Sequence, residues 1–228
     1  MKNLFKYASA QWKSMIAIVA ILILQAYCDL SLPAYTSDIV NVGIQQGGVE
    51  DQIPHALAQE EMDRLLLFVT SDDRQTVLDY YETDDTDYDQ PAYVLKDSAA
   101  DDEAAEEELT GILQVPMMLT AGFESGSEMT QQIEEQLKSQ LPEGMAGDDT
   151  TIFDIMELLP DAQREAMVSS MSEQMDDMPD SILEQAAVSY VRSAYKNLGM
   201  DMDHIQTTYL LVTGGKMTAL ALLGMLAG

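Results

Sequence analysis

Few residues of this chain have the types and spacing that catalysis or metal binding requires. The series Asp85-x-Asp87-x-Asp89 has the spacing with which a calcium loop begins, since Ca²⁺ prefers carboxylate oxygens. Such a loop needs Gly at its sixth position and Glu at its twelfth, where this chain has Gln90 and Lys96. We therefore predict a solvated acidic loop without a metal site, with weak cation binding as the alternative.

A phosphate-binding loop is the second candidate. Gly214-Gly215-Lys216 ends like G-x-x-x-x-G-K-[ST], but the first glycine is missing and Met217 follows the lysine. The segment also lies within an apolar stretch. We therefore reject the phosphate loop and predict no cofactor-binding residue.

The histidines and the cysteine complete the set of reactive side chains. His55 and His204 stand alone near acidic residues, without a nucleophile pattern beside them, and are interpreted as surface histidines. Cys28 is the only cysteine, which excludes an intrachain disulfide, and the chain has no Cys/His cluster for zinc. We predict no catalytic residue and no metal ligand.

Two apolar segments frame the chain. Residues 14–34 contain one charged side chain, Asp29, and residues 207–228 contain one, Lys216. A helix of about 20 residues crosses about 30 Å of hydrocarbon, so both segments are predicted to span a membrane. Because an ionised carboxylate in lipid costs about 3 kcal/mol or more, Asp29 is expected at the outer interface in a structural role rather than as a substrate contact.

A cleaved signal peptide is the rival interpretation of the first segment, which has a basic start and an apolar centre. The candidate cleavage site ends in Tyr27, a bulky aromatic residue where a small one is needed. The same tyrosine spoils a lipoprotein signal at Cys28. A retained membrane helix is therefore predicted.

Charge asymmetry predicts the orientation of the first span. Lys2, Lys6 and Lys13 precede it without any acidic residue, so the N-terminus is expected in the cytoplasm. Residues 1–13 also mix these lysines with apolar and aromatic side chains, which suits an interfacial helix on membrane lipid. The second span stops at Gly228 without a flanking basic residue. We therefore expect the chain to be truncated, the front part of a longer multi-pass protein of the cell membrane.

Residues 49–205 form an acidic middle segment with 38 acidic and 7 basic residues, a net charge of −31. This excess excludes nucleic acid as a partner, because phosphate binding needs a basic surface. The segment is expected outside the cytoplasm and mostly helical. Methionines at helical spacing are interpreted as core residues rather than metal ligands.

Apolar periodicity and turn residues predict the elements of this middle segment. Residues 92–95 are expected to be extended, and 111–122 to be a strand or loop, because Pro116 disfavours a long helix. Ser71 is the expected N-cap of a short helix, and Ser181 with Glu184 is expected to form a capping box. The predicted helices cover residues 53–70, 72–81, 152–159, 161–175 and 179–198.

The most specific motif lies across the end of the first span. Residues 25–48 read QAYCDLSLPAYTSDIVNVGIQQGG, with a Leu-x-Leu-Pro step at 30–33 and an Asp-Ile-Val-Asn-x-Gly-Ile ending at 38–44. This segment resembles the first transmembrane helix of ABC exporters of the multidrug type. Residues 202–228, with a Thr-Gly-Gly-Lys-Met step at 213–217, are similar to the start of the second helix in that family.

The resemblance implies a mainly α fold: membrane-spanning helices of an ABC exporter transmembrane domain plus a mostly helical acidic extracytoplasmic insert. Only a few residues join the two helices in typical members, whereas about 150 are inserted here, as in some Gram-positive bacterial relatives. The implied regions are a cytoplasmic interfacial helix (1–13), the first transmembrane helix with its outward extension (14–48), the insert (49–205) and the start of the second transmembrane helix (206–228).

The resemblance also implies a function for the whole protein, an ATP-driven half-transporter. This chain would contribute to the substrate translocation pathway, while ATP and Mg²⁺ would bind a nucleotide-binding domain outside it. The expected partners are membrane lipid, a second half-transporter in a homo- or heterodimer, and an unidentified small-molecule or peptide substrate. The alternative is a membrane-anchored extracellular binding or sensor module, in which two spans simply hold the acidic domain.

Overall fold

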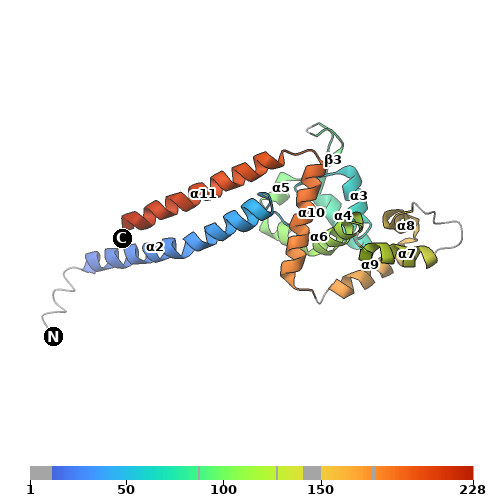
Figure 1. Cartoon of the computed structure of the whole chain (residues 1–228), viewed down its shortest axis with the longest axis horizontal. Helices are drawn as coiled ribbons and strands as arrows, with labels where there is room; N and C mark the ends of the chain where they lie inside the picture. Colours follow the sequence, from blue (N-terminus) through green and yellow to red (C-terminus); the bar gives the residue numbers. More distant parts are fainter. Residues whose placement is uncertain (1–11, 87, 127, 141–149, 176–177, 228) are drawn as a thin grey trace. The chain divides into compact units, whose positions relative to one another are not determined.

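The computed structural model describes residues 12–227 except 87, 127, 141–149 and 176–177 (Figure 1). These residues form two compact units. We call residues 12–49 and 202–227 the hairpin unit, and Glu50–Asp201 the insert unit. The described chain is mostly helical, which confirms the predicted mainly α fold class at this coarse level.

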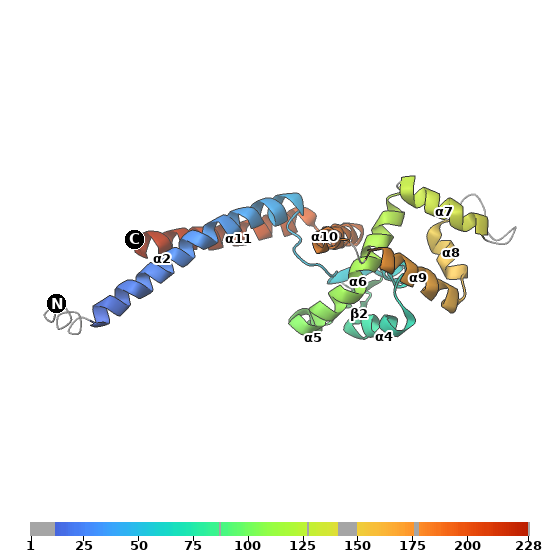
Figure 2. The same cartoon turned by 90° about the horizontal axis from the view of Figure 1, so that it is seen from below.

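Two long apolar helices form the hairpin unit. Helix α2 (Trp12–Asp38) continues directly into a π-helical segment, η1 (Ile39–Gln45), and α11 (Met202–Ala227) lies beside them in both views (Figure 1; Figure 2). Helix α11 begins at Met202, ahead of the position 206 expected from the sequence. The predicted interfacial helix over 1–13 falls largely on residues 1–11, which lie outside the described residues.

A small antiparallel sheet opens the insert unit. Its strands are β1 (Ala56–Ala58), β2 (Tyr81–Asp84) and β3 (Ala92–Leu95), in the order β1-β3-β2. The extended segment predicted at 92–95 is therefore confirmed as the central strand, where the β-favouring Tyr93 and Val94 pair with both neighbours.

The predicted helix over 53–70 is wrong in its first part. Ala56 lies opposite Val94 in the sheet, and helix α3 (Gln59–Leu66) begins only after the strand has ended. None of the three buried residues of β1 is β-branched, so the sequence favoured a helix where tertiary pairing stabilises a strand.

The remaining described helices of the insert unit are α4 (Ser71–Tyr80), α5 (Asp97–Ala100), α6 (Glu103–Glu124), α7 (Glu128–Gln140), α8 (Ile152–Leu158), α9 (Asp161–Met175) and α10 (Asp180–Asn197). The helices predicted over 152–159, 161–175 and 179–198 are confirmed to within two residues at each end.

Helix α6 corrects the prediction of a strand or loop over 111–122. It runs through Pro116, which is buried within the helix. Its buried side chains Leu109, Leu113 and Met117 recur every four residues, and α6 packs against α10. This apolar face offsets the hydrogen bond that the proline removes from the helix interior.

The caps also differ from the predicted ones. Thr70, not Ser71, caps α4, because its hydroxyl accepts from the Asp73 N–H. A capping box does form, but at Thr151 and Asp154 on α8. Helix α10 has Pro179 at its N-cap and no side-chain cap, so the box predicted there is wrong.

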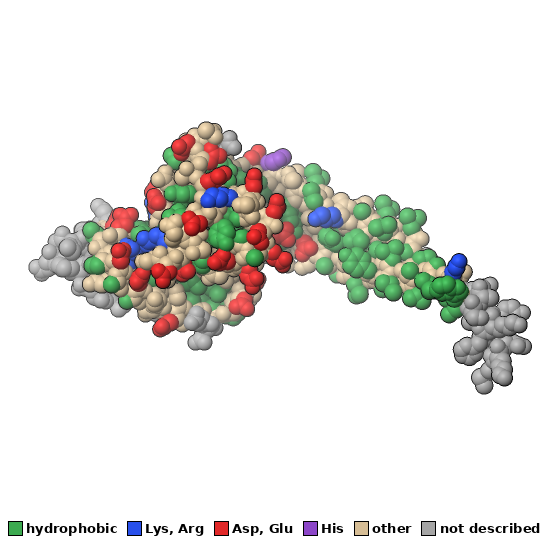
Figure 3. All heavy atoms as spheres, turned by 180° about the vertical axis from the view of Figure 1, so that it is seen from behind, with side chains coloured by type: hydrophobic (Ala, Val, Ile, Leu, Met, Phe, Trp, Pro, Cys, Tyr) green, Lys and Arg blue, Asp and Glu red, His purple; other side chains and the backbone are tan. Residues whose placement is uncertain are grey.

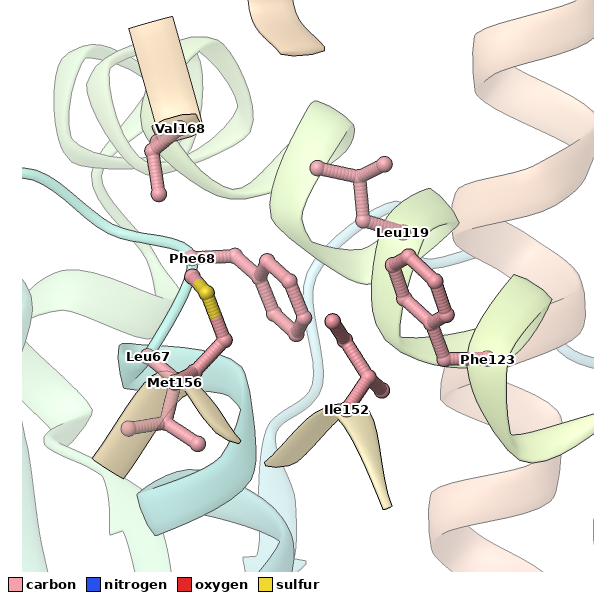
Figure 4. Close-up of a cluster of buried hydrophobic side chains, with 7 residues drawn as sticks. All are labelled: Leu67, Phe68, Leu119, Phe123, Ile152, Met156 and Val168. Atoms are coloured by element: carbon pink, nitrogen blue, oxygen red, sulfur yellow. The ribbon is translucent and has the colours of Figure 1, made fainter. Parts of the chain in front are cut away.

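An aromatic cluster of Phe68, Phe123 and Phe153 joins the segment after α3 to α6 and α8, and Figure 4 shows Phe68 and Phe123 among the buried hydrophobic side chains around them. Phe68 is 1% exposed; its ring stacks on Phe123 at 5.6 Å between centroids and meets Phe153 edge-on at 6.0 Å. Met156 is fully buried in the same cluster, which confirms its interpretation as a core methionine. The cluster fixes the relative positions of α3, α6 and α8.

Candidate functional site

Glycines lie at close contacts between the two arms of the hairpin unit. A Cβ atom added to Gly43 would lie 2.4 Å from Leu210 Cδ2, and one added to Gly48 would lie 2.7 Å from the Cα of Gln206. Gly48 also has φ +83°, a conformation that L side chains rarely adopt. The Gln206 side-chain amide donates to the Gly43 carbonyl at 2.7 Å. A side chain at Gly48 would meet the α11 backbone, whereas one at Gly43 would require the Leu210 side chain to move.

The same pairing continues farther along the hairpin unit. Gly224 faces Cys28, which is fully buried. A Cβ atom added to Gly224 would lie 3.3 Å from the Cβ of Cys28. Gly43 meets Leu210 nearer the start of α11, so the two helices run antiparallel. Small residues at such contacts allow helix backbones in membranes to pack closely.

The outer surface of the hairpin unit is strongly apolar. The most apolar 18-residue stretch of α2 with η1 has a mean hydropathy of 2.1, and that of α11 has a mean hydropathy of 1.6. Only 6% of each stretch is buried. Leu30, Leu211 and Leu226 are 78%, 72% and 85% exposed. Figure 3 shows hydrophobic side chains over these helices and acidic ones scattered over the insert unit. Two helices are thus long and apolar enough to cross a membrane, which supports membrane association.

The insert unit contains an acidic cleft with a volume of ≈ 630 Å³. Helices α3, α6, α7 and α8 line it, together with Asn197 at the end of α10. Among the residues that the structure describes, Arg64 is the only basic one that lines it. Its acidic lining residues are Glu60, Glu61, Asp63, Glu124, Glu134, Asp154 and Glu157.

Glu61 is the most buried acid of the cleft, with 8% of its surface exposed. The Asn197 side-chain amide donates to Glu61 Oε1 at 2.6 Å, whereas Glu61 Oε2 has no hydrogen-bond partner. Burial raises the pKa of Glu61; the Asn197 hydrogen bond opposes this shift and the charge of Glu124 adds to it. The buried Tyr190 hydroxyl also has no partner, and burial and the charge of Glu61 raise its pKa.

Arg64 neutralises one side of the cleft. Its guanidinium donates to Glu60 Oε1 at 2.5 Å and to Glu124 Oε1 at 3.4 Å. The same group lies 5.4 Å from the centre of the Phe153 ring, a cation–π distance. The cleft therefore already holds one planar cation between carboxylates and an aromatic face.

Two further carboxylates hold the start of α8. Asp154 Oδ2 accepts from the Thr151 N–H at 2.8 Å, and Glu134 Oε1 accepts from the Ile152 N–H at 3.3 Å. The hydrogen bonds from Thr151 lower the pKa of Asp154. Both acids thus have structural partners, in contrast to Glu61 Oε2.

The chain matches no protein family, no curated protein and no solved structure. Its function has to be argued from the hairpin unit and the acidic cleft.

The residues singled out from the sequence fall outside the acidic cleft. The Asp29 side chain is exposed on α2. Pro33, four residues later in the same helix, has no N–H to donate to the Asp29 carbonyl. Gly214 and Lys216 lie inside α11, where the Thr218 hydroxyl donates to the Gly214 carbonyl at 2.8 Å. This continuous helix is incompatible with a phosphate loop.

His55 is less isolated than its sequence suggested. Its backbone N–H donates to Tyr195 Oη at 3.1 Å, and that hydroxyl donates to Asp51 Oδ2 at 3.3 Å. The His55 ring also lies 3.8 Å from Asp51. This network ties the start of the insert unit to α10, a structural role.

The acidic loop around Asp85 and Asp89 is described except for Asp87. Among the described residues, which omit Asp87, no group of three His, Cys, Asp or Glu side chains is arranged to hold a metal ion. Asp84 instead accepts hydrogen bonds from Thr86 within its own turn.

Sequence analysis missed the acidic cleft. Its walls come from segments up to about 140 residues apart, and nothing in the local pattern of Glu60-Glu61 distinguishes a buried carboxylate from an exposed one. The only sequence feature that pointed to this cleft was the large acidic excess of residues 49–205.

Proposed function

We propose that this chain forms the first two membrane helices of an ABC exporter's transmembrane domain, with an acidic extracytoplasmic insert between them. The observation that carries the proposal is the antiparallel pairing of α2 and η1 with α11, closed by the contact of Gly48 with Gln206. The residues on either side of the insert, Val49 and Met202, thereby leave the same end of one hairpin. A domain inserted between two consecutive membrane helices has this geometry.

The contacts also give a physical reason for the motif that resembles the exporter family. Gly43 is the glycine of the Asp-Ile-Val-Asn-x-Gly-Ile ending, and it is the residue whose Cβ would overlap Leu210. The motif residues after Asp38 lie in η1, and at the end of η1 the Gln46 N–H donates to the Asn41 carbonyl, five residues back, at 2.9 Å. Such π-helical turns are rare and are frequent at functional sites.

The exposed apolar surfaces support the same proposal. A helix in the core of a soluble protein would be mostly buried, whereas α2 and α11 bury only 6% of their most apolar windows. Lipid and further membrane helices are the surroundings in which such surfaces are stable. Lys2, Lys6 and Lys13 favour a cytoplasmic N-terminus and thus an extracytoplasmic insert.

ATP hydrolysis by the complete protein tests this proposal. Purified residues 1–228 contain no phosphate-loop motif and are expected neither to bind nor to hydrolyse ATP. The complete reading frame, with its partner subunit, is expected to hydrolyse ATP in membrane vesicles. Replacing residues 50–201 by a short polar linker is expected to preserve this hydrolysis, because ATP would bind on the other side of the membrane. A reading frame without the ATP-site motifs would contradict the proposal.

A membrane-anchored binding module is the second candidate, and the acidic cleft is the observation that favours it. The cleft has the volume of ordinary small-molecule sites, which measure about 300–1,000 Å³. A complete protein that binds a ligand through the insert but has no ATPase activity would support this candidate over the exporter.

A further inference from the structure

We propose that the lipid bilayer covers only the inner part of the hairpin unit, and that the outer part extends beyond the bilayer as a pair of helices, which we call the stalk. The stalk comprises η1 and residues 202–215 of α11. This inference rests on the proposed function, and it adds the depth at which the membrane hairpin lies in the bilayer.

The helices are longer than a bilayer requires. Helix α2 has 27 residues and a length of about 40 Å, η1 adds 7 residues, and α11 has 26 residues, or about 39 Å. The hydrocarbon core is about 30 Å thick, and an average tilt of about 20° lengthens the path through it by only about 2 Å. One end of the paired helices therefore extends beyond the hydrocarbon.

The contacts between the two arms define which residues lie at the same depth. Gly43 meets Leu210 and Gly224 meets Cys28, a step of 15 residues along α2 and η1 and of 14 residues along α11. The two arms therefore stay in register to within one residue, and equal steps from a contact reach the same depth.

Each arm has a charged residue at one common depth. Lys216 lies six residues after Leu210 and is therefore level with Ser37, six residues before Gly43. Asp38 follows Ser37 directly. Charged side chains are stable at a bilayer surface and costly inside the bilayer, so this depth marks the outer boundary of the hydrocarbon.

The residues on the inner side of this boundary suit lipid. Between Lys13 and Asp38 the one charged residue is Asp29, and residues 217–227 have none. A bilayer shifted outward to cover the stalk would enclose Asp38 and Lys216 as well, and it would leave the apolar start of α2 in water. The inner placement thus buries more apolar surface and fewer charges. It puts Asp29 nine residues inside the boundary, deeper than the interface position expected from the sequence.

Aromatic side chains lie at both ends of the lipid-covered part. Trp12 and Tyr35 are 23 residues apart, which is about 35 Å along a helix. Trp and Tyr are enriched at the two membrane–water interfaces, which lie on either side of about 30 Å of hydrocarbon. The spacing of these two residues therefore matches the thickness of one bilayer.

Polar groups of the stalk favour water over lipid. Asp203 and His204 are exposed at the start of α11, and Gln45 is exposed in η1. The Gln206 amide donates to the Gly43 carbonyl at 2.7 Å and so holds the two helices of the stalk together. Inside lipid every backbone group needs a protein partner, whereas outside it water can satisfy the groups at the end of η1.

Spin labels on the whole chain in phosphatidylcholine vesicles test this depth. Each label is attached to an introduced cysteine, and its accessibility to oxygen, which dissolves preferentially in hydrocarbon, is compared with its accessibility to a water-soluble nickel chelate. Cys28 is fully buried, so the wild-type chain provides the background. Ser98→Cys, at an exposed position of the insert unit, is the reference for water.

Four substitutions compare the two parts of the hairpin unit. Ile23→Cys and Leu222→Cys place labels in the lipid-covered part, while Ile44→Cys and Leu211→Cys place them in the stalk. The native side chains are matched in type and are 65%, 55%, 59% and 72% exposed in that order. Each part is thus sampled on both arms, and circular dichroism checks that every labelled variant keeps the wild-type helix content.

The ratio of oxygen to nickel accessibility gives the result. At Ile23 and Leu222 this ratio is expected to be about tenfold higher than at Ser98, because hydrocarbon excludes the polar chelate. At Ile44 and Leu211 it is expected to equal the ratio at Ser98.

Two outcomes would overturn the inference, and they differ in what they leave standing. A ratio at Ile44 or Leu211 as high as that at Ile23 would put the stalk in lipid, while the membrane hairpin itself would remain. Ratios at all four positions equal to that at Ser98 would mean that neither helix enters the bilayer, and the proposed function would fail as well.

Discussion

Replacing Gly43 by alanine tests how closely the two membrane helices pack. The added Cβ would lie 2.4 Å from Leu210 Cδ2, too close without movement of one of them. Overpacking of this kind costs about 1–3 kcal/mol, while alanine gains about 1 kcal/mol over glycine in a helical backbone. The net expectation for Gly43→Ala is a destabilisation of the hairpin unit by about 0–2 kcal/mol.

Leu210→Ala removes the obstructing side chain and gives the prediction a sign that can be checked. In that background Gly43→Ala is expected to stabilise the hairpin unit by up to about 1 kcal/mol, since only the helical preference remains. The double-mutant cycle should therefore give a coupling energy of about 1–3 kcal/mol between Gly43 and Leu210.

Amide hydrogen exchange of the chain in micelles provides the assay. The Gln46 and Gly48 N–H groups donate to Asn41 and Val42 at 2.9 Å and 2.8 Å, and they exchange when this end of the hairpin opens. Each 1.4 kcal/mol of destabilisation changes the exchange rate about tenfold. If Gly43→Ala accelerates exchange equally with and without Leu210→Ala, the two residues do not touch and the pairing of α2 with α11 is wrong.

Four further substitutions give expected outcomes. Gly48→Ala and Gly199→Ala both place alanine at φ +83°, which costs about 1–2 kcal/mol. Only the Cβ at Gly48 would also overlap α11 backbone, so hydrogen exchange should show a larger loss of stability for Gly48→Ala. Equal losses of stability in the two variants would contradict the contact. Phe68→Ala is expected to destabilise the insert unit by about 3–5 kcal/mol in denaturant titrations, and a loss below about 1 kcal/mol would show that the aromatic cluster is not a core. Thr151→Val removes the α8 capping box at a cost of about 1 kcal/mol. Because hydrogen bonds from the Thr151 backbone N–H and hydroxyl lower the pKa of Asp154, the wild-type chain gains stability above pH 3.8 that it loses as the pH falls through the lowered value. Thr151→Val keeps the backbone donor and removes only the hydroxyl, so pH titrations of stability should show a smaller acid-dependent loss in the variant.

The sequence predicted the elements whose signals are local. Thr151 to Leu158 carries its own cap and apolar spacing, and the segment after Pro160 begins a new helix as expected. The same reasoning failed at Pro116, because the apolar face of α6 gains enough from packing on α10 to tolerate a proline inside the helix. It failed again at Ala56, where pairing with β3 outweighs the helical preference of alanine.

The candidate sites depend even more on tertiary structure. The motif around Gly43 was visible in the sequence, but the close approach of Leu210 follows only from the hairpin geometry. Glu61 resembles its neighbours on α3 in every local respect. It is buried because residues up to Asn197 close over it, and no pattern within a few residues of it encodes that burial.

Thiol labelling in intact cells tests the membrane hairpin and its orientation most directly. Ser98→Cys places a thiol on an exposed position of the insert unit, and Ser9→Cys places one before the first span. Cys28 is fully buried, so the wild-type chain provides the background. A membrane-impermeant maleimide is expected to label Ser98→Cys and to leave Ser9→Cys unlabelled until the cells are lysed. Labelling in the opposite order, or of both positions in intact cells, would contradict it.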